Sequence, residues 1–167
     1  MEEYEVRDVS MRAEAPALTL TFRLASMPVT AATPQGAAVT HLDISPVIAN
    51  EAPTPAEYIV INIFVDTRLL LPKGYADLHL AEHEDNLAID GRDFECKILS
   101  MNHGIPSKIP IFQGATFSLL QKPLTIGLME PGKYVLGSRL LSPRMSQKLQ
   151  ASFLVWDGTQ ANIVAAN

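Results

Sequence analysis

The chain has 167 residues, of which 47% are hydrophobic and 19% charged, and its formal net charge is −5. This length suits one domain with a substantial core, and the hydrophobic content excludes an intrinsically disordered chain. The acidic balance, with Lys and Arg scattered, argues against a nucleic-acid-binding protein, which needs clustered positive charge. The N-terminus, M-E-E-Y-E-V-R-D, has no apolar core of a secretory signal, and no apolar run approaches the roughly 20 residues of a membrane helix. We therefore expect a cytoplasmic protein that does not contact membranes.

The N-terminal part divides into a lead-in segment and the first strand. Residues 1–17 are polar and end in Ala-Pro-Ala, so we interpret them as a segment that precedes one domain over residues 18–167. Leu18–Leu24 then alternates apolar residues with Thr, Thr and Arg, which is the period of a half-buried strand.

The next two segments are predicted as a loop and a strand. Residues 27–38 are rich in Pro, Thr and Gly and favour a loop. Val39–Ile48 is predicted as a strand, and Pro46 places it at an edge or a bulge because Pro removes one ladder donor.

The most apolar and most β-branched stretch is Pro55–Leu71, which predicts a central strand. One face of this strand is entirely apolar: Ile59, Ile61, Ile63 and Val65. The other face is partly polar: Tyr58, Val60, Asn62 and Phe64. If no later loop covers Val60, Phe64 and Leu69–Leu71, the exposed apolar patch marks a protein partner or a homodimer.

Shorter strands are predicted along the rest of the chain, at Ala76–Ala81, Phe94–Met101, Thr116–Leu120, Leu124–Leu128, Tyr134–Leu141, Ser152–Trp156 and Ala161–Val164. Asp90-Gly91 and Asp157-Gly158 indicate tight hairpins, and residues 142–150 indicate one helical turn or a loop. About ten short strands with long Pro- and Gly-rich loops predict an all-β protein, either a sandwich or a barrel.

One local pattern favours a two-layer β-sandwich of immunoglobulin-like or C2-like architecture. Leu128, Pro131, Gly132 and Tyr134 resemble the L-x-x-P-G-x-Y corner of immunoglobulin-like and fibronectin-type domains. There the Tyr hydroxyl returns to upstream backbone and ties the crossover between the two sheets. The alternative is that Tyr134 is an ordinary strand aromatic after a Pro-Gly turn.

A metal-dependent hydrolase is one hypothesis that the motifs raise. His79-Leu80-Ala81-Glu82-His83 matches H-x-x-E-H, the inverted zinc-peptidase pattern, with Glu130 available as a third ligand. That chemistry requires a helix, because a helix brings two His four residues apart to one metal. The segment alternates as a strand instead, and a strand would separate the two His by about 13 Å. We therefore prefer an exposed acidic loop at residues 83–86.

A calcium or small-molecule site is a second hypothesis, because acidic residues crowd residues 77–93. They are Asp77, Glu82, Glu84, Asp85, Asp90 and Asp93. Clustered carboxylates in loops are more often only solvated, so we assign no catalytic, cofactor-binding or metal-ligating residue.

The sequence around the cysteine and the serines also shows no pattern that indicates a catalytic nucleophile. Cys96, the only cysteine, lies on an alternating run and is read as a small buried hydrophobe. His41 and His103 are read as surface or hydrogen-bonded residues. No context indicates an activated hydroxyl at any of four serines, Ser107, Ser138, Ser142 and Ser146.

The order of segments resembles a C-terminal β-rich region of bacterial proteins that carry an N-terminal AlbA-type or Schlafen-like putative ATP- and DNA-binding domain. The residues that carry this resemblance are Y-E-V-R-D-V-S-M-R, L-T-L-T-F-R-L, N-E-A-P-T-P-A-E-Y-I-V-I-N-I-F-V-D and I-F-Q-G-A-T-F-S-L-L. The resemblance implies an accessory domain, because the enzymatic or DNA-contacting part of such proteins lies in their other domain. We expect a non-enzymatic accessory or protein-interaction β-sandwich that binds a protein partner or forms a homodimer.

Overall fold

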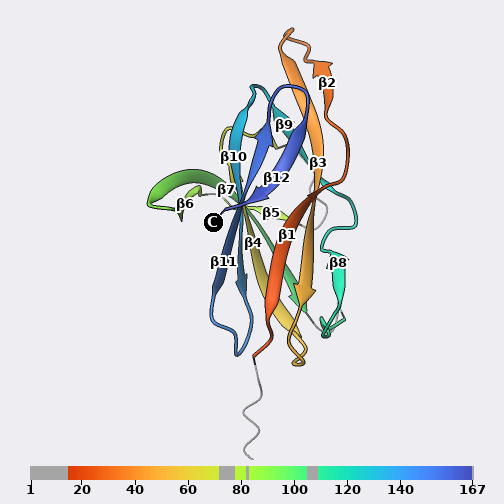
Figure 1. Cartoon of the computed structure of the whole chain (residues 1–167), viewed down its shortest axis with the longest axis vertical. Helices are drawn as coiled ribbons and strands as arrows, with labels where there is room; N and C mark the ends of the chain where they lie inside the picture. The colour runs from red at the N-terminus through yellow and green to blue at the C-terminus, as the bar shows by residue number, and fades with distance from the viewer. Residues whose placement is uncertain (1–14, 72–77, 82, 105–108, 167) are drawn as a thin grey trace, which may run out of the picture.

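Two antiparallel sheets pack against each other around one main core (Figure 1). The computed structural model describes residues 15–71, 78–81, 83–104 and 109–166, and this part of the chain contains strands and no helix. The strands are β1 (Leu18–Leu24), β2 (Val29–Ala32), β3 (Ala38–Asn50), β4 (Tyr58–Asp66), β5 (His79–Leu80), β6 (Asp85–Ile89), β7 (Arg92–Gly104), β8 (Thr116–Ser118), β9 (Leu124–Leu128), β10 (Gly132–Leu141), β11 (Lys148–Trp156) and β12 (Ala161–Ala165). The predicted all-β sandwich is confirmed.

The smaller sheet is built on β3, which pairs with β1, β2, β8 and β9. The loop predicted over residues 27–38 is wrong in part, because β2 forms a hairpin with the start of β3. Thr33 closes its tip: its carbonyl accepts the Gly36 N–H, and its hydroxyl accepts the Ala37 N–H. The positive φ of Gly36, 83°, permits this tight return of the chain.

Pro46 lies inside a paired strand and not at an edge, which corrects the prediction. It pairs with Phe22 of β1, and its carbonyl accepts the Leu119 N–H on the opposite side of β3. Residues 40–44 of β3 pair with β9, and residues 47–49 pair with β8. Pro46 is therefore tolerated because its missing N–H falls in the interval where β3 changes partner.

The larger sheet has the order β12-β11-β10-β4-β7-β5, with β6 paired to the first half of β7. The central position predicted for β4 is confirmed, since it lies between β10 and β7. Its inner side chains are fully buried in the main core together with side chains of β1, β3 and β9: Ile59, Ile61, Ile63 and Val65.

A second, smaller core lies on the outer face of this sheet. Phe64 is fully buried there, in contact with residues of the β6–β7 hairpin and of β10 and β11: Leu87, Ile89, Cys96, Val135 and Phe153. The hairpin turns at Asp90-Gly91, as predicted, with φ of 52° and 73°. In Figure 1 the hairpin curves out from the body of the larger sheet. This cover buries Phe64 and removes it from the expected apolar patch.

The tyrosine corner is present at the crossover from β9 to β10. The Tyr134 hydroxyl donates a hydrogen bond to the backbone carbonyl of Glu130, four residues upstream. Since β9 pairs within the smaller sheet and β10 within the larger one, this bond ties the connection between the two layers. Burial raises the pKa of the Tyr134 hydroxyl, although the neighbouring Arg68 guanidinium opposes this shift. The hydroxyl therefore remains a hydrogen-bond donor at neutral pH.

We expect Ala substitutions at two neighbouring residues of β10, Gly137 and Ser138, to have opposite effects on stability. A Cβ at Gly137 would lie 2.5 Å from Leu87 Cδ2 and 3.4 Å from Phe64 Cβ, so Gly137→Ala must shift the buried Leu87 side chain of β6. Ser138 is fully buried, and its hydroxyl has no hydrogen-bond partner among the described residues. We expect Gly137→Ala to destabilise by about 1–3 kcal/mol. We expect Ser138→Ala to be neutral or stabilising by about 1 kcal/mol. Urea unfolding of both variants measures the difference, and equal effects would contradict the packing described for the two faces.

Candidate interaction site at the open edge

β1 and β2 form one interrupted edge of the smaller sheet. β9 pairs with residues 40–44 of β3, a range that overlaps the β3 residues paired with β2 and also those paired with β1. Since a strand has two sides, β1 and β2 must both lie on the side opposite β9. Leu24 pairs with Ile44 and Val29 with His41, so the four residues 25–28 face only two residues of β3. The edge is therefore broken by a bulge at residues 25–28.

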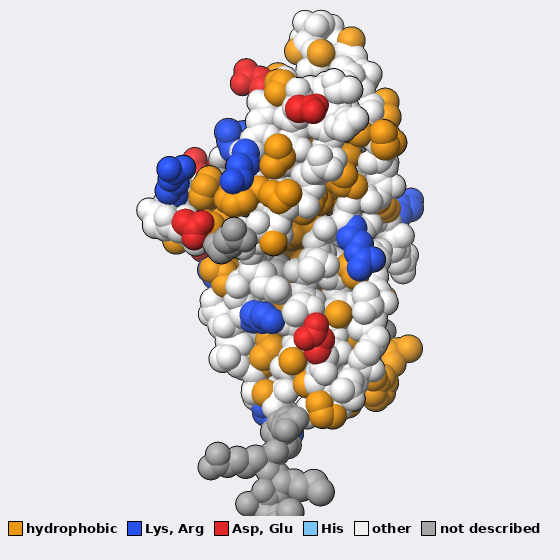
Figure 2. All heavy atoms as spheres, viewed as in Figure 1, with side chains coloured by type: hydrophobic (Ala, Val, Ile, Leu, Met, Phe, Trp, Pro, Cys, Tyr) orange, Lys and Arg blue, Asp and Glu red, His pale blue; other side chains and the backbone are white. Residues whose placement is uncertain are grey.

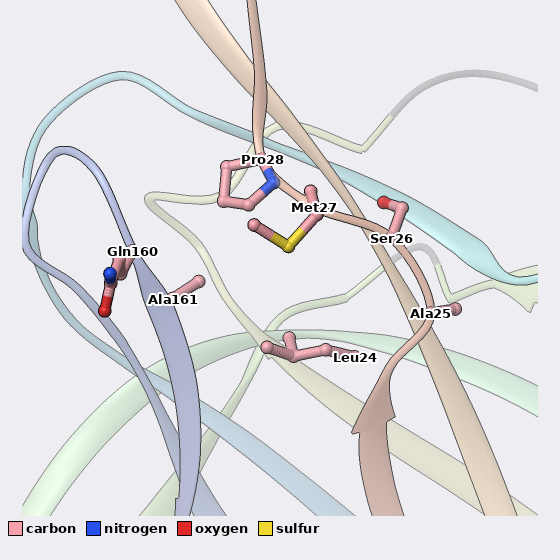
Figure 3. A pocket seen from close by; sticks show the side chains of 7 residues that line it. All are labelled: Leu24, Ala25, Ser26, Met27, Pro28, Gln160 and Ala161. Carbon is pink, nitrogen blue, oxygen red and sulfur yellow. The ribbon is translucent and has the colours of Figure 1, made fainter.

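A groove of about 480 Å³ opens at this bulge, between the edge of the smaller sheet and β12 at the edge of the larger one. It is lined by Leu24, Ala25, Ser26, Met27, Pro28, Gln160 and Ala161. Figure 3 shows the side chains of Leu24, Met27 and Pro28 pointing across the groove toward Ala161. Met27 is 77% exposed at the groove, and Val29, which follows Pro28, is 62% exposed.

The residues that line the groove carry no charge. Residues 24–42 and 158–167 contain no Asp, Glu, Lys or Arg. In Figure 2 hydrophobic side chains gather over the upper half of the visible face, where β12 and the end of β1 lie in Figure 1. The groove is therefore suited to an uncharged, apolar occupant and not to a charged ligand.

Backbone groups of β12 point out of the larger sheet beside this groove. The Ala166 N–H donates to the Ala151 carbonyl, and the Asp157 N–H donates to the Gln160 carbonyl. Because hydrogen-bonded pairs alternate along an antiparallel ladder, the backbone groups of the even-numbered residues of β12 point toward β11. The N–H and C=O groups of Ala161, Ile163 and Ala165 therefore point away from β11. Within the described part of the chain these groups have no backbone hydrogen-bond partner, so they can receive another strand.

The zinc motif is not brought together in the described part of the chain. His79 lies in β5, opposite Ser100 of β7, so the helix that H-x-x-E-H chemistry requires is not formed at this residue. His79 and His83 are both exposed, and Glu130 is an exposed turn residue before β10. Glu82 lies outside the described residues.

The acidic residues of the calcium hypothesis are dispersed where they are described. Asp85 begins β6, where its carboxylate accepts the Asn86 N–H and lies 3.7 Å from Arg139. Asp90 forms the hairpin turn, while Glu84 and Asp93 are exposed. Asp77 and Glu82 lie outside the described residues. Among the residues that are described, no group of three or more His, Cys, Asp or Glu is placed to hold a metal ion.

The surroundings of the remaining candidates, which are one cysteine, two histidines and four serines, do not indicate catalysis where they are described. Burial, together with the negative charge of Asp66 and Asp85, raises the pKa of the buried Cys96 thiol to about 12, so the reactive thiolate is not formed at neutral pH. His103 Nε2 lies 2.9 Å from the Ile109 carbonyl oxygen, and His41 is exposed on β3. The serines have three described environments: Ser138 is buried, Ser142 donates to the Tyr58 carbonyl, and Ser146 is exposed, while Ser107 lies outside the described residues.

The apolar patch expected beside the central strand is largely covered. Phe64 and Leu69 are fully buried, whereas Val60 and Leu71 are half-buried and Leu70 is 43% exposed. The open edge, which consists of the groove at residues 24–28 and the outward side of β12, was missed by sequence reasoning. Its available signal was the charge-free stretch 24–42, of which residues 27–38 were assigned to a loop.

The structure is a two-sheet antiparallel β-sandwich with a groove that is lined by uncharged residues. Comparison with protein-family models, with curated protein sequences and with solved structures found no match for this chain. The resemblance to the β-rich region of AlbA-type or Schlafen-like proteins stays a prediction. In the described chain, no helix is of a length and hydropathy that would span a membrane.

Proposed function

We propose that this chain is a non-enzymatic interaction domain of a cytoplasmic protein, and that its partner is an extended, uncharged polypeptide segment bound at the open edge. The observation that carries the proposal is the apolar groove at the bulge, bordered by the outward backbone groups of β12. An added strand takes its affinity from backbone hydrogen bonds and its specificity from pockets for alternate side chains. The open edge offers both.

The surroundings support an uncharged partner. With a net charge of −5, the chain repels acidic partners at long range, and the groove provides no carboxylate or cation to pair with a charged segment. The groove volume lies in the range of about 300–1,000 Å³ that is typical of binding sites. An accessory role beside a separate enzymatic domain, as the resemblance implies, agrees with this proposal.

The proposal predicts that an uncharged alternating peptide binds at the groove. We expect T-V-T-V-T-V-T to shift the amide resonances of Leu24–Met27 and Ala161–Ala165 in an NMR titration. The analogue with Glu in place of each Thr is expected not to bind, because it would bring charge to an uncharged groove.

Met27→Glu is the test variant, since it places a carboxylate in the groove. We expect it to raise the dissociation constant for the uncharged peptide by at least about tenfold. Met129→Glu is the matched control, because Met129 is 52% exposed and does not line the groove. Shifts confined to another face, or equal binding by both variants, would contradict the proposed function.

A further inference from the structure

The free edges differ in how they are protected against another strand. The described part of the smaller sheet ends at β1 and β2 on one side and at β8 and β9 on the other. The larger sheet ends at β12 on one side and at β5 and β6 on the other. Natural edges are protected by charges, Pro, bulges, short length or cover by other segments.

Most of these edges are protected. Leu70 covers β9, since its N–H donates to the Gly127 carbonyl and its carbonyl accepts the Gly127 N–H. The Gln150 side chain accepts the outward Leu20 N–H of β1. β2 follows Pro28 and the bulge, β5 and β8 have two and three residues, and β6 begins with Asp85.

Among the residues that the structure describes, none gives β12 one of these protections. Its sequence, A-N-I-V-A, contains no charge and no Pro, and it pairs with β11 in continuous register without a bulge. Ala165 and Val164 are exposed, and Val164 is 44% accessible. The outward groups of Ala161, Ile163 and Ala165 alternate along the edge in the spacing that a new antiparallel strand requires.

We propose that the occupant of this edge is β12 of a second copy of the chain, added antiparallel to form one sheet across the dimer. The inference rests on the proposed function, because it names the segment that fills the open edge. A two-fold axis at Ile163 places each Ile163 opposite its copy, and Ala161 opposite Ala165. Each of these outward pairs exchanges two backbone hydrogen bonds.

The charge distribution favours a second copy. Two acidic chains associate through surfaces on which like charges do not meet. Antiparallel self-pairing brings each residue close to its own copy or to a near neighbour, so a charged residue on the paired edge would repel its copy. β12 satisfies this condition, because residues 158–167 are uncharged. The added strand also extends the larger sheet across the mouth of the groove, where its inner side chains cover Leu24 and Met27.

The first test is the mass of the protein in solution by sedimentation equilibrium. The wild type is expected to shift with concentration toward twice its 18.2 kDa monomer mass. Ala165→Pro removes an outward donor without removing a bond to β11, so it is expected to remain a monomer with unchanged circular dichroism. A wild type that stays monomeric at every concentration, or an Ala165→Pro variant that still dimerises, would overturn the inference.

A charge variant provides a second route. Val164→Lys is expected to raise the dimer dissociation constant at least about tenfold, because it charges both copies of the paired edge. Leu149→Lys is the control: Leu149 is 45% exposed on β11 but does not pair with β12. Equal effects of the two substitutions would contradict pairing through β12.

The register is tested with an engineered cysteine. Cys96 is fully buried and is the only native thiol, so Ile163→Cys, at a half-buried position, introduces the more accessible of the two thiols. Paired residues of this type have Cα atoms about 5.5 Å apart, which permits a disulfide. We expect Ile163→Cys to form a covalent dimer on mild oxidation and Leu149→Cys to remain monomeric. The opposite result would exclude this register.

The failure of the inference and that of the proposed function are distinguishable. A monomeric wild type that still binds T-V-T-V-T-V-T at Ala161–Ala165 would exclude the second copy and leave the interaction site intact. A monomer that does not bind this peptide would exclude both.

Discussion

Replacement of Phe64 by Ala is expected to lower the free energy of unfolding by about 3–5 kcal/mol, although Phe64 projects from the outer face of its sheet. The reason is the second core. Phe64 has no exposed surface, since the β6–β7 hairpin lies over it, and the Arg139 guanidinium lies 5.0 Å from its ring centre. Removal of the ring leaves a cavity and loosens the contact of the hairpin with β10.

Val60→Ala is the matched control, because Val60 lies on the same face of β4 but is only half-buried. We expect it to lower stability by about 1 kcal/mol or less. Equilibrium unfolding in urea measures both variants. Similar small losses at the two positions would show that the hairpin does not cover Phe64 in solution.

The Asp66 carboxylate is expected to make the second large contribution, with a loss of about 2–4 kcal/mol in Asp66→Ala. Asp66 is 3% exposed and joins the end of β4 to the start of β10. Oδ1 accepts the Arg68 N–H and Nε at 3.0 and 2.9 Å, and Oδ2 accepts Arg68 Nη2 and the Val135 N–H at 2.7 and 3.1 Å. Without the carboxylate, the buried Val135 N–H has no acceptor.

The same site predicts a pH dependence. Burial alone would raise the pKa of Asp66, but the hydrogen bonds from Arg68 and Val135 hold the pKa below its usual value of 3.8. Because the folded-state pKa is lowered, the ionised carboxylate stabilises the fold above about pH 4. This stabilisation is lost as the pH falls through the folded-state pKa.

Unfolding measured from pH 7 to pH 2 tests this sign. The stability difference between wild type and Asp66→Ala is expected to be largest at neutral pH and to decrease below pH 4. A difference that stays constant across this range would contradict a stabilising charge at Asp66.

Alternation and turn chemistry predicted the sandwich because those signals are local. Leu18–Leu24 and Leu124–Leu128 were found at the predicted bounds, and Asp90-Gly91 formed the predicted hairpin. The Tyr134 corner was also readable, since four residues define it. β2 was missed because its apolar residues are small and exposed, so no half-buried alternation marks it.

The candidate site was not predictable from local patterns. Met27 and Ala161 are 134 positions apart, and only the stacking of the two sheets brings them to one groove. The cover over Phe64 has a similar origin, because β6 carries Leu87 back onto β10. The zinc motif shows that a local pattern can also mislead. The residues at 79–83 match H-x-x-E-H, but His79 lies in a strand and not in the helix that the motif requires.

Amide hydrogen exchange in β12 tests the open edge most directly. The Asn162 and Val164 N–H groups face β11, whereas those of Ala161, Ile163 and Ala165 face outward. We predict that the amides of Asn162 and Val164 exchange slowly at every protein concentration. The exchange of the outward amides is expected to become slower as the concentration rises, because a second β12 then pairs with them. Outward amides that exchange at one fast rate at all concentrations, with or without the uncharged peptide, would contradict the account.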